Sequence, residues 1–193
     1  MTILTDNLLL ERIRRGDTTS FETLFHRHYD RVYGLLFRLV GNRAEAEELT
    51  QETFVKLYRH IFKPSPARKV KESLGKEENI SAWLYRVATN LGYDALRSRK
   101  RRWARNTMLV PDPEGSPAAE AEIEQKEKEA AVRDALAQLP PRQGQLLLLR
   151  QMGLSYAQCA EACAVAPGSV GTMIARAARA FREIYENVGE ENE

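Results

Sequence analysis

The amino-acid sequence predicts an all-α protein built as two small helical domains that are joined by a flexible acidic linker. Apolar residues recur at helical spacing through most of the 193 residues, and almost no stretch alternates in the way that a strand does. Three prolines and a glycine interrupt this pattern between residues 106 and 118. We therefore expect a first domain over 1–105, a linker over 106–118 and a second domain over 119–193.

The composition excludes several classes of protein. The chain is 43% hydrophobic and 29% charged with a formal net charge of +2, which is typical of a soluble globular protein. Its apolar runs are too short to cross a bilayer, and its first residues lack the basic start and apolar core of an export signal. Two cysteines are too few to cross-link a chain of this size. We expect a cytoplasmic protein without membrane insertion or disulfides.

The first domain is expected to contain a helix that is capped near Asp17, where Thr19 and Glu22 have the spacing of a capping box. Apolar residues follow at helical spacing until Gly41 ends this helix. The next helix is predicted from about residue 43 to residue 61, with its apolar residues on one side.

Prolines at positions 64 and 66 end that helix, because proline lacks a backbone N–H and restricts the residue before it. The stretch 63–78 resembles an insertion, and its basic part from residue 67 onward is expected to be a loop or a short exposed helix. Asn79 can then cap a long fourth helix that runs to about Arg105.

The second domain is predicted to begin with a helical block near Ala119. The two prolines after Leu139 interrupt this block, the apolar run 146–149 continues it, and Gly153 makes a turn. Everything from residue 119 onward therefore favours helices that are connected by short turns.

The last two predicted helices have the spacing of a helix-turn-helix motif. Ser155 begins a capping box, and the short helix that it opens ends near Ala164. The final helix runs from about residue 167 to residue 187, with Ala160 and Val170 packed where the two helices cross. An ordinary helical hairpin has similar spacing and stays an alternative. Four residues are predicted to point outward, where a major groove would lie: Ser169, Thr172, Arg176 and Arg179.

The fourth helix carries two stripes when its residues are placed at steps of 100°. One stripe is apolar and is expected to face the core. The other alternates aromatic, guanidinium and amide groups, which can stack on bases, hold phosphates and read a base edge. This combination suits unpaired nucleic acid, although half-buried aromatics and solvated arginines are the simpler alternative. The second stripe consists of Trp83, Arg86, Asn90, Tyr93 and Arg97.

Charge is unevenly distributed around the end of this helix. Residues 97–105 read RSRKRRWAR, with six basic residues and no acid, whereas residues 112–129 hold seven acids and two lysines. This asymmetry indicates a polyanion-binding element followed by an acidic connector, with a solvated helix end and linker as the alternative. The basic residues that we assign to nucleic-acid binding besides Arg97 are Arg99, Lys100 and Arg101.

Together these features resemble the bacterial sigma factors of the extracytoplasmic-function (ECF) type. The resemblance runs from about Leu8 to Tyr185, apart from the stretch 63–78 and the linker. Three segments carry it: AEAEELTQETFVKLYRHI over 44–61, ISAWLYRVATNLGYDALRSRKRR over 80–102, and the segment 139–179 from LPPRQGQ to IARAAR. Their order and spacing match the two-domain plan of that family.

The resemblance implies a non-enzymatic initiation factor that binds core RNA polymerase and directs promoter-specific transcription. The stripe on the fourth helix would recognise and open the −10 promoter element, and the helix-turn-helix would read the −35 element. The helix after Pro141 would lie near the polymerase flap, and an anti-sigma partner would hold the free, monomeric factor inactive. Four polar residues would contact the clamp helices of the largest polymerase subunit: Glu48, Gln51, Glu52 and Lys56.

The second domain departs from the family pattern at three positions. Gly171 and Met173 stand where the recognition helix usually carries basic residues, and Ala164 stands where the turn usually has glycine. An alanine at positive φ costs about 1 kcal/mol, and a lost base contact costs about 1–3 kcal/mol. We therefore expect weak or altered reading of the −35 element.

No catalytic, cofactor or metal site is predicted. Cys159 and Cys163 lie four residues apart on one helix, which would suit two metal ligands or a redox pair, but no further ligands lie nearby in the sequence. His26, His28 and His60 form no cluster. Two alternatives to a sigma factor stay open: a helix-turn-helix regulator that acts without polymerase, and an enzyme that uses the two cysteines with a metal.

Overall fold

The structure is a computed structural model that describes residues 4–62, 79–103 and 117–190. Within these ranges every regular element is a helix, as the all-α prediction expects. The first group comprises α1 (Asp6–Arg14), α2 (Thr18–Val40), α3 (Arg43–Phe62) and α4 (Ile80–Trp103). The second group comprises α5 (Pro117–Gln138), α6 (Pro141–Gln151), α7 (Tyr156–Cys163), the 3-10 turn η1 (Pro167–Ser169) and α8 (Val170–Glu190). The predicted loop 63–78 and nearly all of the predicted linker 106–118 lie outside the described residues.

Side-chain caps mark the starts of several helices, and one of them corrects a prediction. The cap of α2 is Asp17 itself, whose carboxylate accepts hydrogen bonds from the backbone N–H groups of Thr19 and Ser20 at 3.0 and 3.3 Å. Thr19 therefore lies inside the first turn, and the predicted Thr19–Glu22 capping box is wrong. An aspartate two residues ahead is an equally good cap and leaves Thr19 free to donate its hydroxyl to Asp17.

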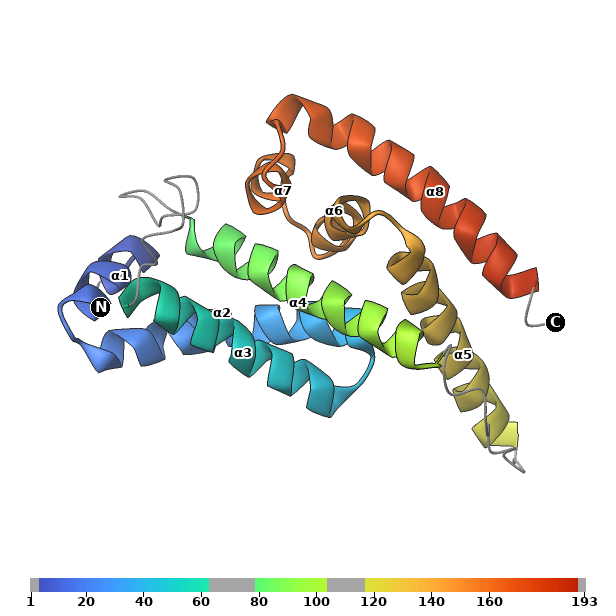
Figure 1. Ribbon diagram of the computed structural model, residues 1–193, viewed down its shortest axis with the longest axis horizontal. Coiled ribbons are helices and arrows are strands. Elements are labelled where there is room, and N and C mark those ends of the chain that lie inside the picture. The colour runs from blue at the N-terminus through green and yellow to red at the C-terminus, as the bar shows by residue number, and fades with distance from the viewer. Residues whose placement is uncertain (1–3, 63–78, 104–116, 191–193) are drawn as a thin grey trace.

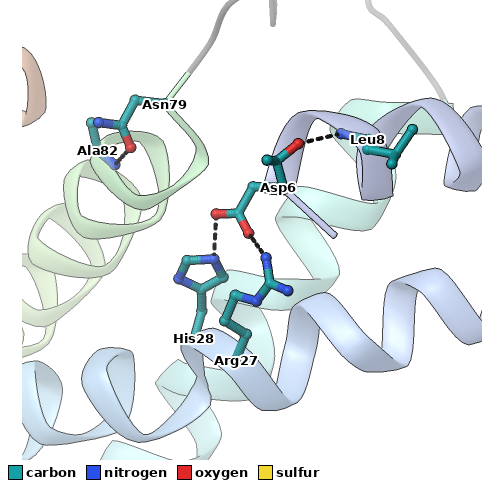
Figure 2. A network of polar contacts seen from close by, with 7 residues as sticks. Asp6, Leu8, Arg27, His28, Asn79 and Ala82 are labelled. Carbon is teal, nitrogen blue, oxygen red and sulfur yellow. Dashed lines mark hydrogen bonds and ion pairs between the residues drawn. The ribbon is translucent and has the colours of Figure 1, made fainter. Parts of the chain in front are cut away.

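The other predicted caps are confirmed. Asn79 accepts a hydrogen bond from the Ala82 N–H at 3.2 Å at the start of α4 (Figure 2). Ser155 and Gln158 form the reciprocal capping box at the start of α7. Gly41 ends α2 with φ +68°, a left-handed conformation that glycine adopts without a Cβ penalty.

A polar network fastens α1 to α2, and Figure 2 shows Asp6 placed between the side chains of Arg27 and His28. Asp6 accepts from Arg27 Nη1 at 2.5 Å and lies 2.8 Å from His28 Nε2. Burial tends to raise the pKa of Asp6, but the hydrogen bonds and charges of His28 and Arg27 outweigh it and lower this pKa. His28 is thus accounted for by a structural contact.

The core of the first group is made mainly of leucines from all four helices. Their apolar side chains recur at helical spacing, so each helix buries one stripe against its neighbours. The fully buried leucines in these helices are Leu9, Leu24, Leu35, Leu36, Leu39, Leu57 and Leu84.

The helix α4 is the member of the first group that faces the second group (Figure 1). It packs on α2 and α3 on one side and on α6 and α7 on the other. One continuous apolar cluster therefore joins both groups, from Leu9 in α1 to Val170 at the start of α8. No helix in the described part of the chain is long and apolar enough to span a membrane.

Candidate nucleic-acid interface

The two aromatic residues of the predicted α4 stripe are buried. Trp83 is 7% exposed and packs near the His60 ring, with centroids 5.2 Å apart, while Tyr93 is 1% exposed beneath α6. In this structure Trp83 and Tyr93 therefore pack in the core, as the simpler alternative has it, and their rings are not exposed for stacking on bases. The physical reason is that α4 is a central helix, so it buries side chains on two sides.

The polar members of the stripe lie nearer the surface. Arg86 is half-buried, whereas Asn90 and Arg97 are exposed. The Asn90 side-chain oxygen accepts a hydrogen bond at 2.8 Å from the amide of Gln145 on α6. Arg97 donates to the Tyr93 carbonyl at 3.3 Å and to Asp94 at 3.2 Å. Arginine and amide groups thus gather along one side of α4, next to the helices of the second group.

The basic run at the end of α4 is partly committed to structural contacts. Arg99 donates to the Val40 carbonyl at 2.9 Å and forms an ion pair with Glu45, so it ties α4 to the turn between α2 and α3. Arg101 is exposed and donates to the Ser98 hydroxyl at 3.1 Å. The side chain of Lys100 lies outside the described residues.

The helix α3 presents the residues that we predict to contact polymerase. All four side chains are exposed, and Lys56 forms an exposed ion pair with Glu52 at 3.1 Å. One of them, Gln51, helps to line an apolar hollow of about 510 Å³ between α2 and α3. Tyr58, 50% exposed, forms an edge-to-face pair with Phe21 on its wall. The four predicted contacts are Glu48, Gln51, Glu52 and Lys56.

The apolar residues of this helix, which include Tyr58, were expected on one side. Tyr58 instead stands at the surface. Val55, Tyr58 and Phe62 repeat at spacings of three and four residues, offset from the buried Phe54 and Leu57. That second apolar stripe is the signal that could have revealed an exposed apolar surface on α3.

The helices α7 and α8 form the predicted helix-turn-helix arrangement. Ala160 and Val170 are buried at their crossing, and Ala164 ends α7 with φ +52°, as the turn pattern predicts. Thr172, Arg176 and Arg179 are exposed on α8, while Ser169 is half-buried.

The three departures from the family pattern differ in their surroundings. Met173 is partly buried against the apolar cluster, so it serves packing at a position where a basic residue would reach outward. A Cβ added to Gly171 would meet Tyr156 at 3.4 Å, an ordinary contact distance. Ala164 has a strained conformation, and its backbone N–H caps α7 by donating to the Ala160 and Glu161 carbonyls.

The two cysteines are free and buried on α7. Burial raises the pKa of both thiols, to about 12 for Cys163. Both therefore form the thiolate poorly, and the thiolate is the form that reacts and binds metals. No group of three or more histidine, cysteine or acidic side chains with the geometry of a metal site exists among the described residues.

Comparisons with known proteins connect these surfaces to one family. Residues 24–102 match Sigma-70 region 2 and residues 129–181 match Sigma-70 region 4. The ECF RNA polymerase sigma-E factor of Haemophilus influenzae is 34% identical, over 95% of this chain and 95% of that protein.

Two solved structures share the fold at lower identity. The structure of CnrH in complex with the cytosolic domain of CnrY aligns with a TM-score of 0.60 at 19% identity, covering 94% of this chain and 97% of that one. The sigma factor RpoE, in complex with the anti-sigma factor NepR from Bartonella quintana, aligns with a TM-score of 0.51 at 20% identity, covering 88% and 98%.

The presence of both Sigma-70 regions in one helical chain defines the class of protein as a transcription initiation factor. The chain belongs to the ECF RNA polymerase sigma factors, because both sigma regions match and the similarity spans nearly the whole length. It therefore confers promoter specificity on core RNA polymerase.

Proposed function

We propose that α4 is the element that reads the −10 promoter region and holds its unpaired bases. Arg86, Asn90 and Arg97 lie along one side of this helix, and the stripe continues into the basic run at 97–102. Trp83 and Tyr93 would complete the site as stacking platforms, and Tyr93 becomes available once α6 moves away from α4. The observation that carries this proposal is the alignment of arginine and amide groups on α4 inside the matched region 2.

The exposed face of α3 is the proposed docking surface for the clamp helices of the largest polymerase subunit. Glu48, Gln51, Glu52 and Lys56 would make its polar contacts, and the hollow beside Gln51 would accept an apolar side chain of the partner. Exposed aromatics beside a polar rim are typical of protein–protein interfaces.

The second group of helices is proposed to contact the −35 element through α8 and the polymerase flap through α6. Thr172, Arg176 and Arg179 are exposed on α8, and Ser169 stands at the start of that helix. Because Gly171 and Met173 supply no charge, phosphate contacts from the arginines would dominate and base reading would be weak. In these terms the domains 1–105 and 119–193 carry separate promoter contacts.

Regulation by an anti-sigma factor is the fourth part of the proposal. The RpoE structure of similar fold holds an anti-sigma factor, and this chain would be kept inactive in the cytoplasm in the same manner. Pull-down of the tagged chain from its native cells should recover one protein in stoichiometric amount. Recovery of no partner other than polymerase would count against anti-sigma control.

Transcription reconstituted from purified components tests the function directly. The chain is mixed with core RNA polymerase and fragmented genomic DNA, and transcript starts are mapped with and without it. We expect discrete starts that require the chain, lost in Asn90→Ala and in Glu52→Lys but kept in the surface control Arg31→Ala. DNA binding without polymerase binding or new starts would instead identify a regulator that acts without polymerase.

A further inference from the structure

The second group of helices covers the same side of α4 that we assign to promoter DNA. In Figure 1, α6 and α7 lie next to each other against α4, on the side opposite α2 and α3. The contacts made there involve Asn90, Tyr93 and the start of α4, so they fall on or beside the proposed −10 residues. This surface of α4 is therefore covered by α6 and α7 of the same chain.

The tightest contact joins Tyr93 and Gly144. The ring of Tyr93 enters the space that Gly144 leaves by having no side chain, since a Cβ at Gly144 would overlap the Tyr93 hydroxyl oxygen and lie 2.8 Å from its Cζ. Gly144 is inside α6, where glycine is a poor helix former, so its presence favours the approach of α4 over the stability of α6.

The contact between α4 and α6 leaves one buried polar group without a hydrogen bond. Among the described residues, the buried Tyr93 hydroxyl has no hydrogen-bond partner. A tyrosine that served only as core packing would be replaced at no loss by phenylalanine, because a buried unpaired hydroxyl weakens the folded state. The hydroxyl is therefore better explained by a partner that Tyr93 meets when α4 is uncovered.

The hydrogen bond between Gln145 and Asn90 resembles the bond that a DNA base would make to Asn90. Gln145 is 7% exposed and directs its amide N–H to the Asn90 oxygen at 2.8 Å. An exocyclic amino group of a base would present a donor of the same kind to Asn90. Gln145 thus satisfies Asn90 in the absence of DNA and competes with a base for it.

Two further residues mark the edge of this contact. Asn79, at the start of α4, donates to Glu161 on α7 at 2.9 Å. Cys163 on α7 lies near Tyr93 and Arg86, and it is 5% exposed. The thiol is covered in the closed arrangement.

We propose that α6 and α7 act as an intramolecular inhibitor that docks on α4, buries Tyr93 and engages the side-chain oxygen of the exposed Asn90, so that both residues are withheld from unpaired DNA. The free chain is closed, and binding to polymerase or DNA requires the second group of helices to leave α4. This inference rests on the proposed −10 role of α4, and it adds that α6 and α7 of the same chain cover that surface.

Alkylation of Cys163 measures the opening without any assumption about DNA. The full-length variant Gly144→Ala forces α6 away from Tyr93 while improving the helix propensity of α6, so the second group stays folded. The matched control Gly168→Ala adds a methyl group where nothing lies within 4 Å. We expect iodoacetamide to modify Cys163 at least about tenfold faster in Gly144→Ala, since overpacking shifts such equilibria by this order.

Cys159, which is fully buried, is the internal reference that peptide mass spectrometry reads in the same sample. Equal modification of Cys163 in Gly144→Ala and in the wild type, with Cys159 protected in both, overturns the closed state. Equal acceleration at Cys159 and Cys163 indicates unfolding of α7 and overturns the proposal too. The reverse variant Tyr93→Phe loses the unpaired hydroxyl and should slow the modification of Cys163.

A fluorescein-labelled pool of short random-sequence single-stranded DNA tests what the closure withholds. Gly144→Ala should bind this pool at least about tenfold more tightly than the wild type and Gly168→Ala. Faster alkylation with unchanged DNA affinity overturns the withholding of the DNA surface. Reconstituted transcription of Asn90→Ala then separates that result from failure of the −10 assignment: normal starts would remove Asn90 from promoter reading, and lost starts would keep it there.

Discussion

Ala164 has a left-handed backbone conformation that is strained for a residue with a side chain. At φ +52° its Cβ crowds the backbone, which costs about 1 kcal/mol relative to glycine, and the unfolded-state entropy of glycine offsets part of this. We expect Ala164→Gly to raise the free energy of unfolding by about 0.5 kcal/mol, measured by urea denaturation. Ala166→Gly is the control, because Ala166 has φ −66° in the same turn and should lose stability. A loss in both variants would contradict the strain at Ala164.

Asp17 couples the start of α2 to pH. Hydrogen bonds from Thr19 and Ser20 lower the pKa of this carboxyl from 3.8 to about 2. A lowered pKa in the folded state means that the stabilisation is complete above pH 3.8 and is lost as the pH falls towards 2. We expect Asp17→Ala to melt at a lower temperature than the wild type at about pH 6, with a difference that shrinks between about pH 4 and pH 2.

The conservative variant separates charge from cap geometry at the same site. Asp17→Asn keeps an oxygen acceptor for the backbone N–H groups but has no charge, so its melting difference from the wild type should also shrink on acidification while staying smaller than that of alanine. A difference that does not change between about pH 4 and pH 2 would show that the charge of Asp17 does not stabilise α2.

At the scale of the elements, local patterns predicted the helices well. Helical spacing, proline and the caps at Asn79 and Ser155 are local features, so they can be recognised without knowledge of the fold. The exposure of the α4 stripe was not predictable, because Trp83 and Tyr93 are buried by contacts distant in sequence. A helix with two apolar sides gives no sign of which neighbour will cover each one.

The candidate sites likewise combine features that depend on a single helix with features that depend on contacts between helices. The arginines of α8 were placed from helical periodicity, which depends only on the helix that carries them, whereas the polar residues of α3 were assigned from the family resemblance. The commitment of Arg99 to Val40 and Glu45 depends on the turn that α4 happens to approach. Basic character alone therefore could not separate a structural arginine from one available to DNA.

The helix α8 offers a test of the proposed −35 contacts. Each phosphate contact of a basic side chain changes the slope of log affinity against log salt by about 0.9. We expect Arg176→Ala to make this slope shallower by about 0.9 on duplex DNA with the mapped −35 element, and Arg31→Ala, on α2, to leave it unchanged. Footprints of the initiation complex should show weak −35 protection. Strong protection that Arg176→Ala abolishes would contradict the weak reading inferred from Gly171 and Met173.

At the scale of the whole molecule, the two sigma regions share one apolar cluster that passes through α4. This arrangement couples two functions that a flexible linker alone would leave independent. Surfaces that are exposed for function in the open state become core in the closed state, which explains why aromatic residues suited to stacking are compatible with a stable free chain.

The contact between Asn79 and Glu161 allows this coupling to be measured across the two groups of helices. Asn79→Asp keeps an oxygen to cap α4 but sets a second carboxylate against Glu161, so closure should weaken and Cys163 should be alkylated about twofold faster. Glu161→Gln alone should have little effect, since its amide oxygen still accepts from Asn79. In the double variant the new glutamine amide can donate to the new carboxylate at position 79, and the rate should return to that of the wild type. Such non-additivity is typical of groups that are in contact or share one hydrogen-bond network. Independent, additive effects of the two substitutions would show that α7 does not rest on the start of α4 in solution.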